Sequence, residues 1–337
     1  MVSPRDLATT TVWFEVTLVM TKVSTRLMTV TAIVVVGLGM FVGLTSAAAQ
    51  SLSDDFIDRI TGQAPARTTP AAAPVASGSN DKPPPEHAGP ITGPPTTPPG
   101  MPACVSPMAP ASELPHVVGE TVRYAVDVNG LSVGTIDFRV ERRGAVDDTQ
   151  VTEYRSLFKI DDLVATLLPI EGRAASLVAD ATFWPMQAMS RYKIRQDEFD
   201  EKQNFAAGGR KASSHRVKNG KAADDSRIFP GPAQDFVSGF YLLRSIAPGA
   251  KGCAILYGSH RAYTAWIKPD GDEQVMTPVG LRPARRYAIS FASDKAKTVA
   301  EAKLWISTSP EHLPYKAELL TGTHIEARIH LYEDGKN

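Results

Sequence analysis

The chain of 337 residues is poor in the features that usually carry metal chemistry or bind nucleic acid. It has two cysteines, and its 36 basic side chains are balanced by 36 acidic ones. A net charge of zero argues against a nucleic-acid-binding surface, because such a surface needs clustered positive charge. Two cysteines cannot supply a zinc site of the CxxC type, and no histidine motif accompanies them. The sequence therefore predicts no cofactor, no metal site and no nucleic-acid partner.

No catalytic motif of usable strength is present either. Ser238 stands between an aspartate and an arginine, but it lies outside a G-x-S-x-G nucleophile elbow and no motif ties a histidine to it. Four polar residues alternate along the last strand-like run: His324, Glu326, Arg328 and His330. A single ion cannot bridge the two histidines, because positions i and i+6 of a strand lie about 20 Å apart. We interpret this run as a solvated sheet face, with a polar wall inside an open barrel as the alternative.

The two cysteines, Cys104 and Cys253, can pair in an oxidising compartment. Their disulfide would tie the end of a linker to the folded domain. The sequence does not supply the Cα geometry that a bridge requires, so two free thiols stay open as the alternative.

The one long apolar run lies near the start of the chain, at residues 28–44. Lys22 and Arg26 precede it, and the small residues Ala47–Ala49 follow it. A basic flank, an apolar core and an A-x-A site are typical of a secretory signal peptide. We predict a signal peptide at residues 1–49, cleaved after its last alanine, with an uncleaved anchor as the alternative.

Export places the protein in the periplasm or elsewhere in the cell envelope. A start at Met20 instead of Met1 would give a tidier signal peptide. No cysteine stands at the cleavage point, so the sequence does not predict a lipid-modified N-terminus. After cleavage we expect no membrane-spanning helix.

Residues 50–115 are predicted to form a linker. From Gly62 to Pro115 the composition shifts to proline, alanine, threonine and glycine, with runs such as Pro83–Pro85. Such a segment cannot bury enough apolar surface to offset the entropy lost on ordering, and it favours an extended, polyproline-like tether. It is either a spacer that lets the domain reach across the envelope or a disordered linker without that role.

Residues 116–337 are long enough for a single domain with a full core. Apolar and polar residues alternate over 122–128 and again over 136–140, and Asn129 and Gly130 between them predict a turn. This pattern indicates an antiparallel hairpin with one buried face. Further strand-like runs are 153–160, 173–179, 190–195, 213–217, 254–257, 261–267, 273–278, 285–291, 302–307, 315–320 and 325–332.

These strands predict an all-β fold, a curved antiparallel sheet that forms an open barrel or a sandwich. Two segments interrupt the pattern and predict short helices packed across the sheet, at 161–168 and 235–246. Asp235 is a suitable N-cap for the second helix, and Pro248 with Gly249 ends it. Packing against the sheet is the favoured role of this helix, and gating a cavity is the alternative.

Basic residues cluster in one stretch, where Arg191, Lys193 and Arg195 alternate with apolar residues. They would suit a basic rim that meets anionic lipid head groups or cell-wall polymers. Four acidic residues at 197–201 lie close by and cancel most of the local field. We therefore favour a solvated hairpin for this stretch.

Several motifs in this order resemble domain-of-unknown-function family 3108, from about Val118 to Tyr332. They are Gly119-Glu120-Thr121-Val122-Arg123-Tyr124, Asn129-Gly130 through Gly134, a D-x-x-S-x-x-Y-x-x-R pattern on Asp235, Ser238, Tyr241 and Arg244, Thr277-Pro278 before Gly280, and Trp305-Ile306-Ser307 followed by Leu313-Pro314-Tyr315. The chain departs from the family where an acidic residue is expected and Thr308-Ser309 stands. The resemblance implies an exported protein of bacteria with two membranes, and it implies no activity.

The physical roles of these motif residues are structural in our interpretation. The glycines suit turns, Trp305 is a large side chain to bury on a strand, and Arg244 offsets the dipole of its helix. Two functions remain open. One is a non-catalytic carrier that holds a lipid or other amphiphile in its curved sheet, and the alternative is a tethered protein-interaction or scaffold module. An enzyme is the third hypothesis. An apolar cavity of about 300 Å³ or more would favour the carrier.

Overall fold

The computed structural model describes residues 97–335, apart from 112–113, 129, 162–164, 166–169, 297–298 and 321–325. The predicted signal peptide and most of the predicted linker lie outside these residues. So do His324 and nearly all of the helix predicted at 161–168. No helix among the described residues is long and apolar enough to cross a membrane.

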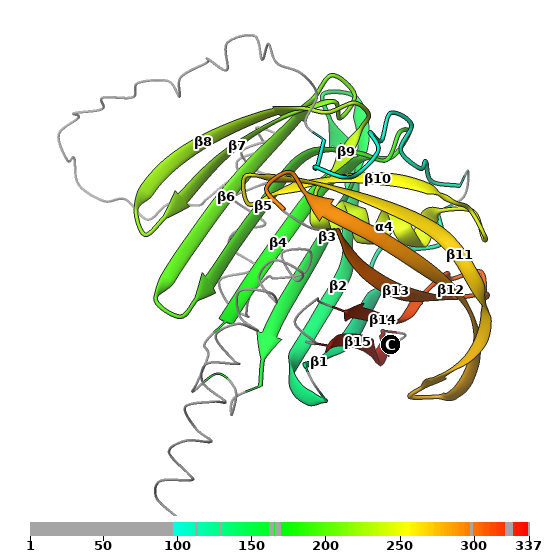
Figure 1. Cartoon of the computed structure of the whole chain (residues 1–337). Coiled ribbons are helices and arrows are strands. Elements are labelled where there is room, and N and C mark those ends of the chain that lie inside the picture. The colour runs from blue at the N-terminus through cyan, green and yellow to red at the C-terminus, as the bar shows by residue number, and fades with distance from the viewer. Residues whose placement is uncertain are drawn as a thin grey trace, which may run out of the picture.

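One large curved sheet dominates the described part of the chain (Figure 1). Its order is β8-β7-β6-β5-β4-β3-β2-β1-β15-β14-β13-β12-β11-β10-β9, and every neighbouring pair is antiparallel except β9 with β10. The strands are β1 Thr121–Val128, β2 Leu131–Val146, β3 Thr149–Ile160, β4 Ile170–Ala179, β5 Trp184–Ile194, β6 Asp197–Ala206, β7 Lys211–Lys218, β8 Lys221–Ile228, β9 Ala233–Gln234, β10 Gly252–Gly258, β11 Arg261–Thr277, β12 Gly280–Ser293, β13 Ala300–Ser307, β14 Pro314–Leu320 and β15 Glu326–Gly335.

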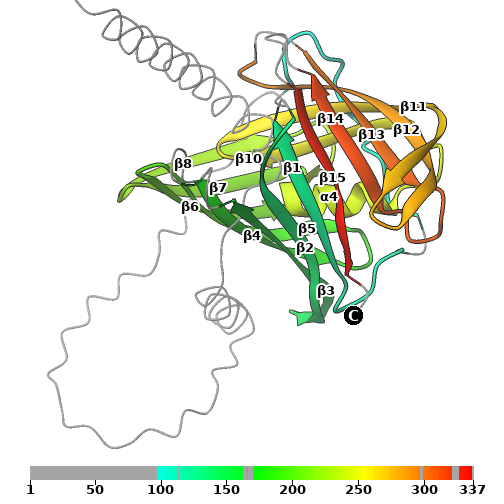
Figure 2. The ribbon, with the colours of Figure 1, turned by 90° about the horizontal axis from the view of Figure 1, so that it is seen from below.

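The sheet curls until its two ends face each other, and Figure 2 shows it wrapped around helix α4 (Phe236–Ser245). Ala212 of β7 and Ile255 of β10 belong to one buried cluster. The Tyr257 hydroxyl of β10 also donates a hydrogen bond to Asp225 of β8, at 2.8 Å. The predicted all-β fold is therefore confirmed, in the form of an open, barrel-like sheet.

Helix α4 packs against the inside of the curved sheet. Phe240 stacks on Phe138 of β2 with ring centroids 3.7 Å apart, and Tyr241 lies 4.2 Å from the ring of Tyr154 on β3. The helix spans nearly the residues that the sequence predicts, with Asp235 as its N-cap. Its apolar residues join the main core, which agrees with a packing role.

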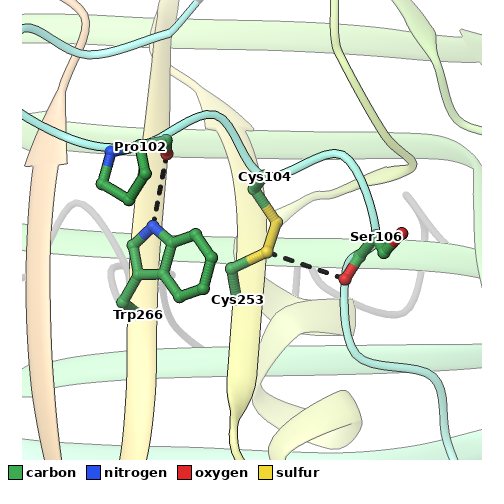
Figure 3. Close-up of a disulfide and its surroundings, with 5 residues drawn as sticks. All are labelled: Pro102, Cys104, Ser106, Cys253 and Trp266. Atoms are coloured by element: carbon green, nitrogen blue, oxygen red, sulfur yellow. Dashed lines mark hydrogen bonds between the residues drawn. A yellow bond between two sulfur atoms is a disulfide. The ribbon is translucent and has the colours of Figure 1, made fainter.

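Residues 97–111 pack against the sheet, although the sequence places them in the linker. A disulfide joins Cys104 to Cys253 of β10, with Cα atoms 5.8 Å apart (Figure 3). The Trp266 indole donates to the Pro102 carbonyl at 3.3 Å, and the Met108 amide donates to the Cys253 carbonyl at 2.8 Å. These contacts hold the segment to the sheet. The sequence analysis placed it in the linker because the segment is rich in proline and lacks the alternating pattern of a strand.

Candidate functional site: the buried polar groups around α4

The start of α4 is a network of hydrogen bonds centred on Asp235, which is buried. One carboxylate oxygen accepts from the amides of Val237 and Ser238, at 2.8 and 3.2 Å. The other accepts from the hydroxyls of Ser238 and Ser176, at 2.7 and 2.5 Å. Burial raises the pKa of Asp235, while these hydrogen bonds act in the opposite direction. The network caps the helix and links it to β4.

One turn further along, Tyr241 lies among aromatic rings. The His116 and Tyr154 side chains share a hydrogen bond of 2.6 Å, and the His116 ring lies 5.1 Å from that of Tyr241. Burial, with the charges of Arg244 and Arg143, lowers the pKa of His116 to about 3. The imidazole is therefore neutral at pH 7. It acts as a polar core group and not as a proton carrier at neutral pH.

The last turn of α4 contains a fully buried guanidinium, that of Arg244. It forms a two-pronged salt bridge with Glu120, which precedes β1, and it donates to the Glu311 carbonyl at 3.2 Å. Burial lowers the pKa of Arg244, but Glu120 outweighs this effect and the net shift is upward. The sequence assigns Arg244 to the helix dipole and misses this ion pair, whose partners lie 124 residues apart.

The motif residues fall into three places. Asp235, Ser238, Tyr241 and Arg244 meet the β1–β4 side of the sheet through the contacts above, and Tyr124 joins them through Phe240, at 5.8 Å between rings. Gly130 and Gly134 lie at the β1–β2 turn, and Gly119 lies at the opposite end of β1. Trp305, Pro314 and Gly280 belong to β12–β14, where the Trp305 indole donates to Glu273.

This arrangement does not form a nucleophile with a base among the described residues. The Ser238 hydroxyl is buried and bonds to Asp235 at both its carboxylate and its carbonyl. Two histidines lie beside α4: His116 pairs with a tyrosine, and His312 hydrogen-bonds to the Arg244 carbonyl. No group of three or more metal-ligating side chains occurs within the part of the chain that the structure describes. The motif residues Asp235, Ser238 and Arg244 therefore make contacts that hold the helix inside the sheet.

A half-open pocket of about 210 Å³ lies beside the C-terminal end of α4. Leu243 and Ile246 form its helix side, and Tyr287 and Ile306 form its sheet side. Arg285 also lines it, but its guanidinium already pairs with Asp272 at 2.7 Å.

Arg328 and His330 of the last strand, β15, form ion pairs with the neighbouring strands. His330 lies 3.4 Å from Asp127 on β1, and Arg328 lies 3.8 Å from Glu318 on β14. These cross-strand pairs agree with a solvated sheet face.

The basic stretch on β5 is also paired. The Arg191 guanidinium donates to Asp200 at 2.9 Å, and Lys193 lies 3.6 Å from Glu198. Both acidic partners are on the neighbouring strand β6, so the positive charges are matched locally, as expected for a solvated hairpin.

The sequence analysis misses a second set of buried polar residues, which lies where the two ends of the sheet meet. Glu201 of β6 accepts from the Ser214 hydroxyl at 2.6 Å and from the Ser259 amide at 3.0 Å. Arg216 stacks over Phe199, 4.6 Å from its centroid, and donates to the Tyr192 hydroxyl at 2.5 Å. The available signal was the alternation of Phe199, Glu201 and Gln203, in which two of three inward residues are polar.

The family model described as protein of unknown function (DUF3108) matches residues 123–327. The chain belongs to this family. No curated protein matches it. The DUF3108 model covers α4 and nearly all of the sheet from β1 to β14, so the residues around α4 lie within the family region, apart from His116 and Glu120 just before it.

Three solved structures are similar in structure to this DUF3108 chain, at low sequence identity. A β-barrel-like protein of family DUF1849 from Brucella abortus is 9% identical with a TM-score of 0.41, over 68% of this chain and 100% of that one. An exported protein with a YmcC-like fold from Bacteroides fragilis is 8% identical with a TM-score of 0.32, over 66% and 97%. The lipoprotein YmcC of Escherichia coli is 5% identical with a TM-score of 0.28, over 65% and 89%. At these values the likenesses carry no argument about function.

Proposed function

We propose that the protein is an exported, non-catalytic interaction or scaffold module of the cell envelope. The observation that carries this proposal is the packing of α4 against the inside of the sheet. Helix α4 and its aromatic side chains pack inside the curved sheet, where Asp235, His116 and Arg244 are each held by hydrogen bonds or an ion pair within the protein. Among the residues that the structure describes, the pocket beside the C-terminal end of α4, of about 210 Å³, is smaller than the roughly 300–1,000 Å³ typical of ligand sites. The outer surface is then the part available to partners.

Export is supported by two features of the chain. The N-terminal sequence has the pattern of a signal peptide, and the disulfide Cys104–Cys253 is of a kind that persists in oxidising compartments such as the periplasm. A sheet packed around α4, with residues 97–111 fastened to β10 by that bridge, is suited to presenting a fixed surface.

The test is native mass spectrometry of the protein purified from a bacterial envelope, followed by organic extraction. We expect a mass without a bound organic molecule. In parallel, a photo-crosslinking residue at Lys303, on the outer face of β13, should give a discrete protein adduct in living cells, and one at Thr308, in the pocket, should not. An amphiphile released by the solvent, with no adduct at Lys303, would overturn the proposal.

The second candidate function is the binding of a small amphiphile in the pocket. The observation that favours it is the lining itself, in which Leu243, Ile246 and Ile306 lie near the guanidinium of Arg285. An Ile306→Trp substitution would fill this space. Loss of a co-purifying molecule in this variant would place the molecule in the pocket.

A further inference from the structure

The β11–β12 hairpin extends beyond the rim of the sheet. The last β13 partner of β12 is Ser307, opposite Ala284, and the Thr308 amide then donates to the Pro283 carbonyl at 3.3 Å. The two strands continue together through the pairs Val275 with Arg282, Met276 with Leu281, and Thr277 with Gly280. Three further pairs correspond to a two-stranded ribbon of about 10 Å.

The side chains at the tip of this ribbon are aliphatic and exposed. Met276 is 71% exposed, Leu281 61% and Val279 59%. Met276 and Leu281 are cross-strand partners, so they share one face of the ribbon. Exposed aliphatic side chains gathered at one tip differ from scattered surface residues, which need no explanation.

The tip is held in shape without a partner. On the other face, Val275 is buried with Ala284 and Trp305. The Thr277 hydroxyl donates to the Gly280 carbonyl at 2.8 Å and accepts from the Val279 amide at 3.3 Å. Gly280 has φ of 100°, which the turn requires and glycine adopts readily. The aliphatic side chains are therefore presented by a preformed turn.

The charge around the tip has one sign. From Gln274 to Ala284 the only charged residue is Arg282, which is exposed. The nearest acidic residue, Glu273, accepts from the Trp305 indole and pairs with Arg286 at 3.4 Å. Nearer the base of the hairpin, Asp272 pairs with Arg285 and Asp270 with Arg286. The same rim of the sheet includes the start of β1, where Val117 and Val118 are 66% and 48% exposed.

We propose that this tip docks on an anionic lipid bilayer, with Met276, Val279 and Leu281 entering the head-group region and Arg282 contacting lipid phosphates. A narrow, convex ribbon cannot supply the roughly 800 Å² per partner of a stable protein interface. A small apolar protrusion can enter a bilayer surface, because the favourable free energy of insertion is proportional to the apolar area removed from water. The negative charge of the bilayer also attracts a nearby arginine. Docking is independent of whether the domain is a scaffold or a carrier.

The test is co-sedimentation of the full chain, purified in its exported form, with vesicles of phosphatidylglycerol and phosphatidylethanolamine. We expect the triple variant Met276→Ser, Val279→Ser, Leu281→Ser to reduce vesicle affinity about tenfold, because it removes the apolar area that enters the bilayer. The matched control is Leu131→Ser with Val299→Ser, which removes exposed aliphatic side chains (55% and 40%) at the opposite rim. This control should bind like the unaltered protein.

Two further variants distinguish the alternatives. Arg282→Gln should reduce binding to these vesicles and have no effect on the weaker binding to phosphatidylcholine. In Val279→Trp, brominated lipids should quench the new fluorescence. Equal binding of the triple and control variants, or absence of quenching, would overturn the proposal. So would light scattering that finds the unaltered protein dimeric and the triple variant monomeric, which would identify a second copy of the chain as the occupant.

Discussion

Arg244 shows at the scale of single residues how the motif positions depend on one another. Its guanidinium is fully buried, and its charge is balanced by Glu120, a residue that lies far away in the sequence. Both belong to the motifs that resemble the family pattern, yet the sequence gives no sign that they meet. A buried charge without its partner is strongly destabilising. The two positions therefore need to be tested together.

We predict that Glu120→Leu lowers the free energy of unfolding by about 3–5 kcal/mol, because it leaves Arg244 buried and unpaired. The double variant Glu120→Leu, Arg244→Met should recover a substantial part of this loss. Urea titration followed by circular dichroism measures both.

The control for this pair is Arg123→Met, which breaks the partly exposed Arg123–Asp137 bridge and should cost about 1 kcal/mol or less. Equal losses for Glu120→Leu and Arg123→Met would show that burial of the Arg244 guanidinium is not what makes its pair important.

His116 predicts a dependence of stability on acid. Its pKa in the folded protein, about 3, lies below the ordinary value of 6.5, so the unfolded chain binds the proton more readily. Above pH 6.5, His116 makes its whole contribution to the free energy of unfolding. As the pH falls from 6.5 toward 3 this contribution decreases, by at most about 1.4 kcal/mol per pH unit. His116→Gln should flatten this part of the stability curve. If thermal melts of the two proteins fall in parallel between pH 6.5 and 4, the assignment to His116 is wrong.

Helices and strands with a clear apolar pattern were predictable from the sequence. Helix α4 was predicted with its N-cap because Asp235 precedes an apolar run, and β1 and β2 were predicted because their apolar residues alternate. β6 was missed because its inward side includes Glu201 and Gln203, and β8 because most of its residues are exposed and polar. β11 was predicted as two strands, since Pro269 and Gly271 interrupt its pattern, but the structure continues it through a bulge there.

The close packing of β2 on β3 predicts different outcomes for two glycines of the same strand. A Cβ at Gly134 would lie 2.2 Å from the Lys159 carbonyl oxygen, and backbone cannot move aside as a side chain can. A Cβ at Gly144 meets nothing within 4 Å. Gly134→Ala should therefore cost about 2 kcal/mol or more, whereas Gly144→Ala should be neutral or slightly stabilising. Guanidinium unfolding of both variants is the measurement, and similar midpoints would contradict the packing seen at this turn.

At the scale of the whole molecule, the sequence could not predict that the curved sheet brings its two ends together. Alternation predicts strands with one buried face, but it does not predict that β10 returns to face β7 or that α4 packs inside the sheet. These contacts join segments far apart in the chain, and a hydrophobic pattern does not show which distant segments pack together. The same reason explains why the candidate site was predicted as motif residues in order along the chain and not as the pairs Glu120–Arg244 and His116–Tyr154.

The disulfide Cys104–Cys253 joins residues 149 positions apart, and it fastens the segment at 97–111 to β10. A bridge across so long a loop removes much of the entropy of the unfolded chain, by up to about 5 kcal/mol in the loop-closure model and typically 2–4 kcal/mol. We predict that the double variant Cys104→Ser, Cys253→Ser lowers the free energy of unfolding within this range.

The same double variant should also admit protease to residues 97–111, because the bridge is the covalent hold on this segment. Limited proteolysis with mass spectrometry, under oxidising and reducing conditions, measures this. The unaltered protein should be cut there only after reduction, and the variant under both conditions. Protection of the segment in the variant would mean that the hydrogen bonds from Met108 to Cys253 and from Trp266 to Pro102 are sufficient to hold it, and that the bridge acts on the unfolded chain alone.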